Sequence, residues 1–168
     1  MSLDSNLYRQ VMRRFATGVA ILTVRDGDHL HGMTANTFTS VSLDPILILV
    51  CIQRVNETHQ HVTRVGHFAL NILSANQREL AQRFAKQSPM PAEPFGDILY
   101  HRENTGAPIL DDCIAYLDCR VVGSHEAGTH TIFIGAVQAA GFGSARDAHP
   151  LLWFAREYVD LEKLIVQN

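Results

Sequence analysis

The sequence lacks several features that would each have indicated a partner or a compartment. Its longest apolar run, residues 46–52, is far too short to span a bilayer, and residues 1–10 contain no apolar stretch of the signal-peptide kind. No basic patch stands out and the net charge is −3, so we expect neither a nucleic-acid nor a membrane partner. The three cysteines are an odd number without zinc-ligand spacing, which predicts a reducing compartment, the cytoplasm.

The motifs of several enzyme classes are missing as well. There is no G-x-S-x-G nucleophile turn, no phosphate-binding loop of the G-x-x-x-x-G-K-[ST] type, and no G-x-G-x-x-G after a first strand. The glycines of residues 141–146 follow a predicted hairpin, so we expect a turn there. The length of 168 residues and the hydrophobic content of 46% predict one domain over residues 1–168.

Residue periodicity predicts few helices and many strands. Pro-rich residues 85–108 break the pattern and predict a surface excursion, either a lid or a partner contact. Six or seven strands with hairpin connections predict a closed or nearly closed antiparallel barrel. The predicted helices begin at Asp4 or Ser5, at Asn56, and at Ser74 with Gln77 in a capping box. The predicted strands cover residues 19–24, a return strand from 29, 46–53, 67–73, 114–125, 130–142 and 150–159.

The stretch HGMTANTFTSVSLDP, residues 31–45, is rich in hydroxyl side chains and Asn36 but has no Lys or Arg. An apolar run follows it directly. The stretch can be an edge strand with one wet face, or a neutral platform for a flat heteroaromatic ring. Beyond the run, Asn56–Thr58 begins a helix whose free N–H groups suit an anion, although spacing alone favours a simple helix cap. A ring platform followed by an anion site matches a flavin nucleotide.

Two H-x-H pairs, His29 with His31 and His59 with His61, suggest metal ligands at first sight. The first pair lies beside a predicted turn and the second in a predicted helix, where residues i and i+2 diverge. No carboxylate and third histidine follow at a supporting spacing. We therefore expect surface histidines and no metal site.

The chain resembles the short-chain flavin reductase family, the FMN-binding split-barrel reductases of two-component flavin-dependent monooxygenases. The motifs occur in family order over nearly the whole chain, and HGMTANTFTSVSLDP is the most specific. The others are FATGVAILTV (15–24), ILILVCI (46–52), HFALNIL (67–73) with RELAQRFA (78–85), GAPILDDCIAYLDCRV (106–121), HTIFIGAV (130–137) and PLLWFAREY (150–158). The implied fold is mostly β, an antiparallel split β-barrel with a few peripheral α-helices.

The resemblance also implies roles for individual residues. Residues 33–42 match the segment that lines the isoalloxazine ring, and residues 51–58 match the stretch from the ring to the flavin phosphate. Arg83 and Phe84 match a pair that closes on the flavin. His130, the candidate catalytic residue, matches a histidine near the nicotinamide. The implied cofactor-binding residues are Met33, Thr34, Ala35, Asn36, Thr37, Ser40, Val41, Ser42, Cys51, Asn56, Thr58, Arg83, Phe84 and Tyr158.

The implied activity is reduction of FMN or FAD by hydride transfer from NADH or NADPH. The reduced flavin then passes to a separate monooxygenase or halogenase. Thr129 stands where the family usually has Asp, which leaves the nicotinamide preference open. We also expect a homodimer, in which residues 89–108 could wrap the neighbour. A non-catalytic flavin-binding or electron-transfer protein and a plain ligand-binding barrel remain alternatives.

Overall fold

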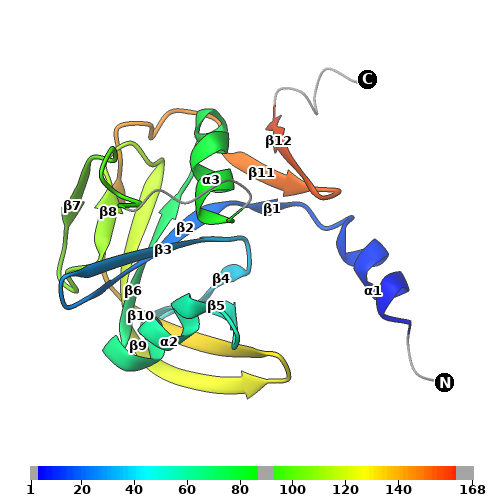
Figure 1. Cartoon of the computed structure of the whole chain (residues 1–168), viewed down its shortest axis with the longest axis horizontal. Helices are drawn as coiled ribbons and strands as arrows, with labels where there is room; N and C mark the ends of the chain where they lie inside the picture. The colour runs from blue at the N-terminus through cyan, green and yellow to red at the C-terminus, as the bar shows by residue number, and fades with distance from the viewer. Residues whose placement is uncertain (1–3, 87–92, 162–168) are drawn as a thin grey trace.

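The computed structural model describes residues 4–86 and 93–161, about half of them in β-strands (Figure 1). Seven strands form one sheet in the order β3-β2-β6-β9-β10-β5-β4, and two smaller sheets have the orders β1-β11-β12 and β7-β8. The strands are β1 (Thr17–Gly18), β2 (Ala20–Asp26), β3 (His29–Ala35), β4 (Phe38–Leu43), β5 (Ile46–Gln53), β6 (His67–Ile72), β7 (Tyr100–Arg102), β8 (Pro108–Leu110), β9 (Ala115–Ala127), β10 (His130–Phe142), β11 (Leu151–Phe154) and β12 (Glu157–Asp160). The helices are α1 (Ser5–Met12), α2 (Glu57–Val65), the 3₁₀ turn η1 (Ala75–Gln77) and α3 (Arg78–Phe84).

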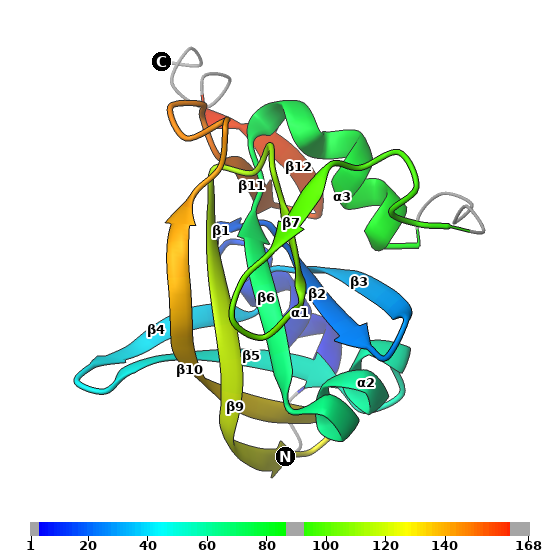
Figure 2. The ribbon, with the colours of Figure 1, turned by 90° about the vertical axis from the view of Figure 1, so that its left-hand side faces the viewer.

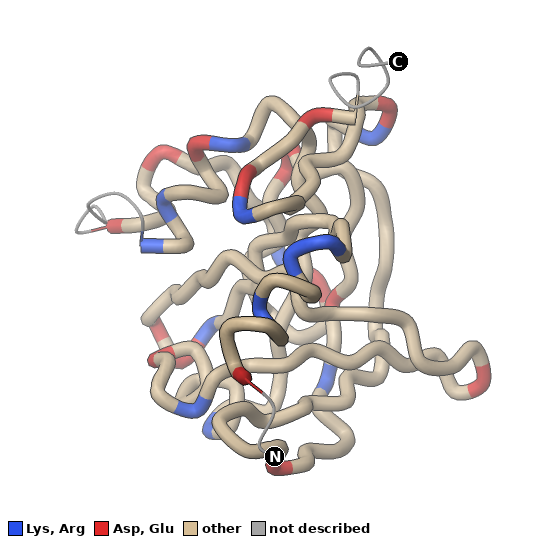
Figure 3. The backbone as a smooth tube through the Cα atoms, turned by 90° about the vertical axis from the view of Figure 1, so that its right-hand side faces the viewer, with Lys and Arg blue, Asp and Glu red and all other residues tan. Residues whose placement is uncertain are grey.

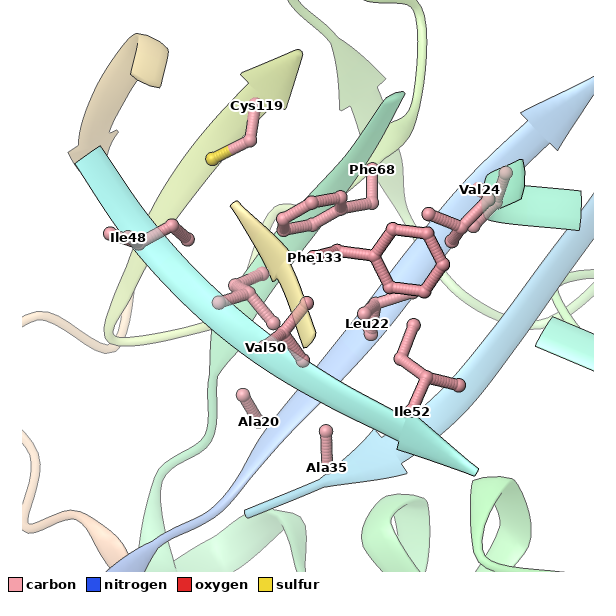
Figure 4. Packing of buried hydrophobic residues seen from close by; sticks show 12 residues of the cluster. Ala20, Leu22, Val24, Ala35, Ile48, Val50, Ile52, Phe68, Cys119 and Phe133 are labelled. Atoms are coloured by element: carbon pink, nitrogen blue, oxygen red, sulfur yellow. The ribbon is translucent and has the colours of Figure 1, made fainter. Parts of the chain in front are cut away.

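The seven-stranded sheet curls around one apolar core. Ala35 on β3 and Ile48 on β5, near opposite ends of the strand order, belong to the same buried cluster as Phe68 and Phe133. Figure 4 shows these two rings packed among aliphatic side chains from β2 and β5. All neighbours in the sheet are antiparallel, and β3 and β4 lie at its two ends without pairing with each other. The predicted antiparallel split barrel is confirmed.

Strand β2 is buried on both faces because a second apolar layer covers one side of the barrel. Leu22 and Val24 belong to the barrel core. Ile21 belongs to a second cluster, together with residues from α3, β11 and β12. Figure 2 shows α3, β11 and β12 gathered at one end of the molecule. The continuous apolar run at residues 19–22 therefore reflects a strand enclosed between two cores rather than one with a wet face.

Local signals placed several boundaries correctly. Asp4 caps α1 by accepting a hydrogen bond from the Asn6 N–H at 2.9 Å. The predicted start of α2 at Asn56 is its N-cap, and Gly66, a usual helix-ending residue, closes the helix in the left-handed conformation. The predicted capping box of Ser74 and Gln77 is present, although it opens a 3₁₀ turn before α3. Residues 143–149 form the predicted turn.

Two predictions about the second half of the chain are wrong. Residues 150–159 do not form one strand but the hairpin of β11 and β12, whose turn places Ala155 and Arg156 at positive φ. The Pro-rich excursion is not a simple surface loop, because its described part folds back onto the protein through β7 and β8. Phe95 and Ala107 in it are buried. Residues 87–92 of the excursion lie outside the described residues.

Helix α1 projects from the body of the protein (Figure 1). Its apolar residues Leu7 and Val11 are four residues apart and so share one face, but none of the helix residues is buried. Leu7 and Val11 are 51% and 61% exposed, and Phe15 just beyond the helix is 65% exposed. The apolar face of α1 therefore has no covering surface within the described chain. An eight-residue helix also has little stability of its own in water, so it would gain from such a surface.

Acidic and basic residues are interspersed along the described chain (Figure 3). No described helix is both long and apolar enough to cross a lipid bilayer.

Candidate functional site

A groove opens between the edge strand β3 and the start of α2, and the end of α3 lies across it. Its volume is about 360 Å³, and a hollow of about 180 Å³ adjoins it, since Thr34 and Ala85 line both. The groove is lined by His31, Gly32, Met33, Thr34, Val55, Asn56, Glu57, Thr58, Phe84, Ala85 and Lys86. The hollow is lined by Val19, Thr34, Asn36, Ala85, Trp153 and Tyr158.

Strand β3 forms one wall of the groove. Because β3 pairs only with β2 within the described sheet, alternate backbone N–H and C=O groups along its other edge have no strand partner. The Thr34 hydroxyl donates to the backbone carbonyl of Ala81 at 2.6 Å, which ties the strand to α3. Gly32 permits this close packing, because a Cβ there would lie 2.5 Å from Cε1 of Phe84.

The first turn of α2 forms the opposite wall. The Asn56 side chain makes no capping bond, and its Nδ2 lies 3.4 Å from Sδ of Met33. The Thr58 hydroxyl is 2.7 Å from Nε2 of His31, so Thr58 offers the groove mainly its backbone N–H. Nζ of Lys86 lies 3.8 Å from Oε2 of Glu57, so this end of the groove has one charge of each sign. Free N–H groups beside a lysine favour an anion.

Polarity changes along the groove. The hollow beside Trp153 and Tyr158 has no charged side chain in its lining, and these two rings meet edge to face with centroids 4.9 Å apart. The ionic residues Glu57 and Lys86 lie at the α2 end. Burial lowers the pKa of His31 to about 4, and this imidazole is therefore neutral at pH 7. A flat neutral ring suits one end and an anionic group the other.

The structure brings only part of the predicted ring segment to this groove. Met33 and Thr34 line the groove and Asn36 lines the adjoining hollow, whereas the Ala35 side chain is part of the barrel core. The remaining members of the segment line neither the groove nor the hollow. The Thr37 hydroxyl donates to the carbonyl of Cys51 at 2.8 Å. The other three lie on β4, at the opposite end of the sheet from β3: Ser40, Val41 and Ser42.

The other candidates divide in the same way. Phe84 and Tyr158 line the groove and the hollow, but the Arg83 guanidinium is engaged by the Asp97 carboxylate at 2.6 and 2.8 Å. Cys51 lies on β5, half-buried, and lines neither space.

His130 begins β10, and its Nδ1 is 2.9 Å from the hydroxyl of Thr129. It lines neither space, but the Thr129 carbonyl accepts the Arg54 N–H at 3.0 Å. This bond holds the β9–β10 turn against the segment that leads to Val55 in the groove.

Sequence reasoning missed several groove residues. Lys86 follows α3 with no motif to mark it, and Trp153 lies more than a hundred residues from β3. The expectation of surface histidines is also wrong for two of them. His31 and His61 are only 9% and 7% exposed, and they meet across β3 and α2 because the fold joins positions that no local spacing connects.

A split barrel whose groove suits a flat ring at one end and an anion at the other defines a nucleotide-binding protein. A family model described as "Flavin reductase like domain" matches residues 12–162, and the chain belongs to this family.

Named relatives agree with this family. A reductase subunit of a flavin-dependent monooxygenase, HsaB from Mycobacterium tuberculosis (strain CDC 1551 / Oshkosh), is 30% identical over 95% of this chain and 84% of its own length. An NADH-dependent FAD reductase from Streptomyces globisporus is 40% identical over 83% of this chain and 77% of its own. The crystal structure of BorF, the flavin reductase component of a bacterial two-component tryptophan halogenase, superposes with a TM-score of 0.84 at 36% identity, covering 94% and 98% of the two chains.

Proposed function

We propose that this chain is an NADH-dependent flavin reductase that binds FMN or FAD in the groove and releases the reduced flavin to a separate monooxygenase or halogenase. The observation that carries the proposal is the division of polarity along the groove in a chain of this family. The relatives' names support NADH as the reductant and an oxygenase or halogenase as the recipient. The free cysteines support a reducing compartment, the cytoplasm.

The flavin fits the residues present in one orientation. Met33–Asn36 on and beside the edge of β3, together with Phe84 and the Trp153–Tyr158 pair, would hold the isoalloxazine ring. Unpaired backbone groups of β3 can hydrogen-bond to the carbonyl and nitrogen edge of the ring. The backbone N–H groups at the first turn of α2 would hold the phosphate, with Lys86 close by.

The protein contributes binding and orientation. When bound, the flavin supplies the chemistry by accepting a hydride from the nicotinamide. Met33, Thr34 and Phe84 would hold and orient the ring against the second ring from which it takes the hydride. Because the ring end of the site has no charged side chain, flavin is held by a few neutral hydrogen bonds and can leave for a partner enzyme. His130 positions the nicotinamide from the adjacent β9–β10 turn.

Flavin binding and NADH consumption test this function together. We expect saturable NADH oxidation with FMN and with riboflavin. Lys86→Ala should weaken FMN binding several-fold and leave riboflavin binding unchanged, because riboflavin has no phosphate. Arg120→Ala, which removes an exposed charge on β9, is the matched control. If Lys86→Ala weakens the binding of both flavins equally, the proposed phosphate position is wrong. Flavin binding without NADH oxidation would favour a non-catalytic flavin protein. The absence of any flavin binding would favour a different ligand.

We also propose that the protein is a homodimer in which a second copy covers α1. The support is the unburied apolar face of that helix, with Leu7 and Val11 more than half exposed. Light scattering should give the dimer mass at micromolar concentration. The double variant Leu7→Glu/Val11→Glu should give monomer, whereas Arg9→Ala on the same helix should not. A monomeric wild-type protein with full activity would refute this proposal.

A further inference from the structure

Four potential metal ligands meet where the start of β3 faces α2. His29 and His31 are two residues apart on one strand and so share a face. Glu57 and His61 are four residues apart on one helix and also share a face. One ligand atom from each side chain lies within 4.8 Å of the ligand atoms of the other three. Three imidazoles and one carboxylate thus converge from two elements that are separate in sequence.

His61 is already oriented toward the cluster. Its Nδ1 is 2.8 Å from Oδ2 of Asp26, and the Asp26 carboxylate is also paired with Arg64. The opposite ring nitrogen, Nε2, is buried and has no hydrogen-bond partner in the described structure. It lies 3.7 Å from Oε1 of Glu57, and the side chain is 9% exposed. A histidine that binds a metal through one ring nitrogen usually donates a hydrogen bond from the other nitrogen to a carboxylate, which orients the ring toward the metal. Asp26 holds His61 in this way.

The other two histidines complete this arrangement. Nε2 of His31 is engaged by the Thr58 hydroxyl at 2.7 Å, which leaves Nδ1 available. The His31 and His29 rings lie 4.8 and 5.3 Å from the His61 ring, centroid to centroid. His29 is exposed, so the cluster is open to solvent on one side and a metal ion can enter.

We propose that His29, His31, His61 and Glu57 bind a late first-row divalent metal ion of the Zn²⁺ type. Imidazole with carboxylate is a ligand set that suits such ions. A tetrahedral Zn²⁺ site needs its ligand atoms about 3.4 Å apart, so the four side chains, whose ligand atoms already lie within 4.8 Å of one another, would have to close in only slightly on the ion. The site does not rest on the proposed flavin chemistry, although His31 and Glu57 also line the groove.

Metal binding by untagged, chelator-treated protein tests this site, because a polyhistidine tag would bind the same ions. After equilibrium dialysis against ZnCl₂, we expect one Zn²⁺ per chain. His29→Ala removes an exposed ligand at little risk to folding and should weaken Zn²⁺ binding at least tenfold, as should His61→Ala. Asp26→Asn should weaken it by about 10–100-fold, because it removes the contact that orients His61.

Matched controls lie outside the cluster. His59→Ala removes a histidine of the same helix, and His125→Ala removes an exposed one on β9; both should leave Zn²⁺ binding unchanged. Zn²⁺ should also raise the melting temperature of the wild type but not that of His29→Ala. CoCl₂ should give the visible absorption of a tetrahedral site only in proteins that retain all four ligands.

Two results would overturn the proposal. One is that no Zn²⁺ binds, or that it binds equally well to His29→Ala. The other is that His29→Ala retains Zn²⁺ but weakens FMN relative to riboflavin, which would assign the imidazoles to the flavin phosphate instead. A failure of the flavin proposal leaves the dialysis result unaffected, since that measurement contains no flavin and no NADH.

Discussion

Replacing Gly32 by alanine should deform the groove wall that β3 forms. The added Cβ would lie 2.5 and 2.7 Å from two ring carbons of Phe84 and 3.2 Å from Cζ of Phe95. The Phe84 ring cannot easily move away, because it is 2% exposed and packs against Phe95 with centroids 5.2 Å apart. Overpacking of this kind costs about 1–3 kcal/mol of folding free energy, which for a chain of this length lowers the melting temperature by roughly 2–12 °C.

Thermal unfolding followed by circular dichroism, together with FMN titration, would measure both consequences. FMN binding should weaken as well, because Phe84 is part of the groove wall. Gly18→Ala is the matched control: a Cβ there meets no atom within 4 Å and the residue has no positive φ. Phe84→Leu in the Gly32→Ala background should recover part of the lost stability. If Gly32→Ala melts with the wild type and with Gly18→Ala, the packing argument is wrong.

The remaining predictions concern the core, the thiols and the nicotinamide. Asn71 is fully buried and accepts the Leu110 N–H at 2.8 Å, so Asn71→Ala should cost about 1–3 kcal/mol in urea unfolding; an unchanged midpoint would contradict this. Burial raises the pKa of Cys113 to about 11 and of Cys119 to about 12 from 9.0. The unfolded chain therefore loses these protons first, and stability should fall as pH rises above about 9, less steeply in Cys119→Ala; an equally steep fall in the variant would argue against it. His130→Ala should lower the hydride-transfer rate about tenfold, which corresponds to ~1.4 kcal/mol, or raise the KM for NADH, while flavin affinity and melting temperature stay unchanged. If the variant instead loses flavin or stability and keeps its NADH kinetics, His130 has a structural role.

Most of the fold was predictable because its signals are local. The Asp4 cap, the Ser74–Gln77 box and the left-handed Gly66 each depend on residues within one helical turn. The turn between β11 and β12 was missed because Ala155 and Arg156 occupy positive φ, where glycine or asparagine is the usual marker. The burial of the Pro-rich excursion was missed because it depends on contacts with distant strands.

The site was predictable only where it follows one strand or one helix start. Met33, Thr34 and Asn36 are neighbours on or beside β3, and Asn56 immediately precedes α2, so pattern and resemblance find them. The approach of His61 to the start of β3 has no such signal. It depends on how α2 packs across the edge of the barrel, which no spacing of histidines along the chain encodes.

The open edge of β3 also bears on aggregation. An unpaired strand edge is a template on which another chain can add a strand, and soluble proteins protect such edges. Here the protection comes from the groove walls: Ala81 holds Thr34 from one side, and the α2 turn that carries Thr58 holds His31 from the other. Phe84 and Lys86 line the space between these two contacts, so the open edge of β3 lies inside a groove rather than on a flat surface. The walls that select a flat ligand thus also keep neighbouring molecules from pairing with this edge in a crowded solution.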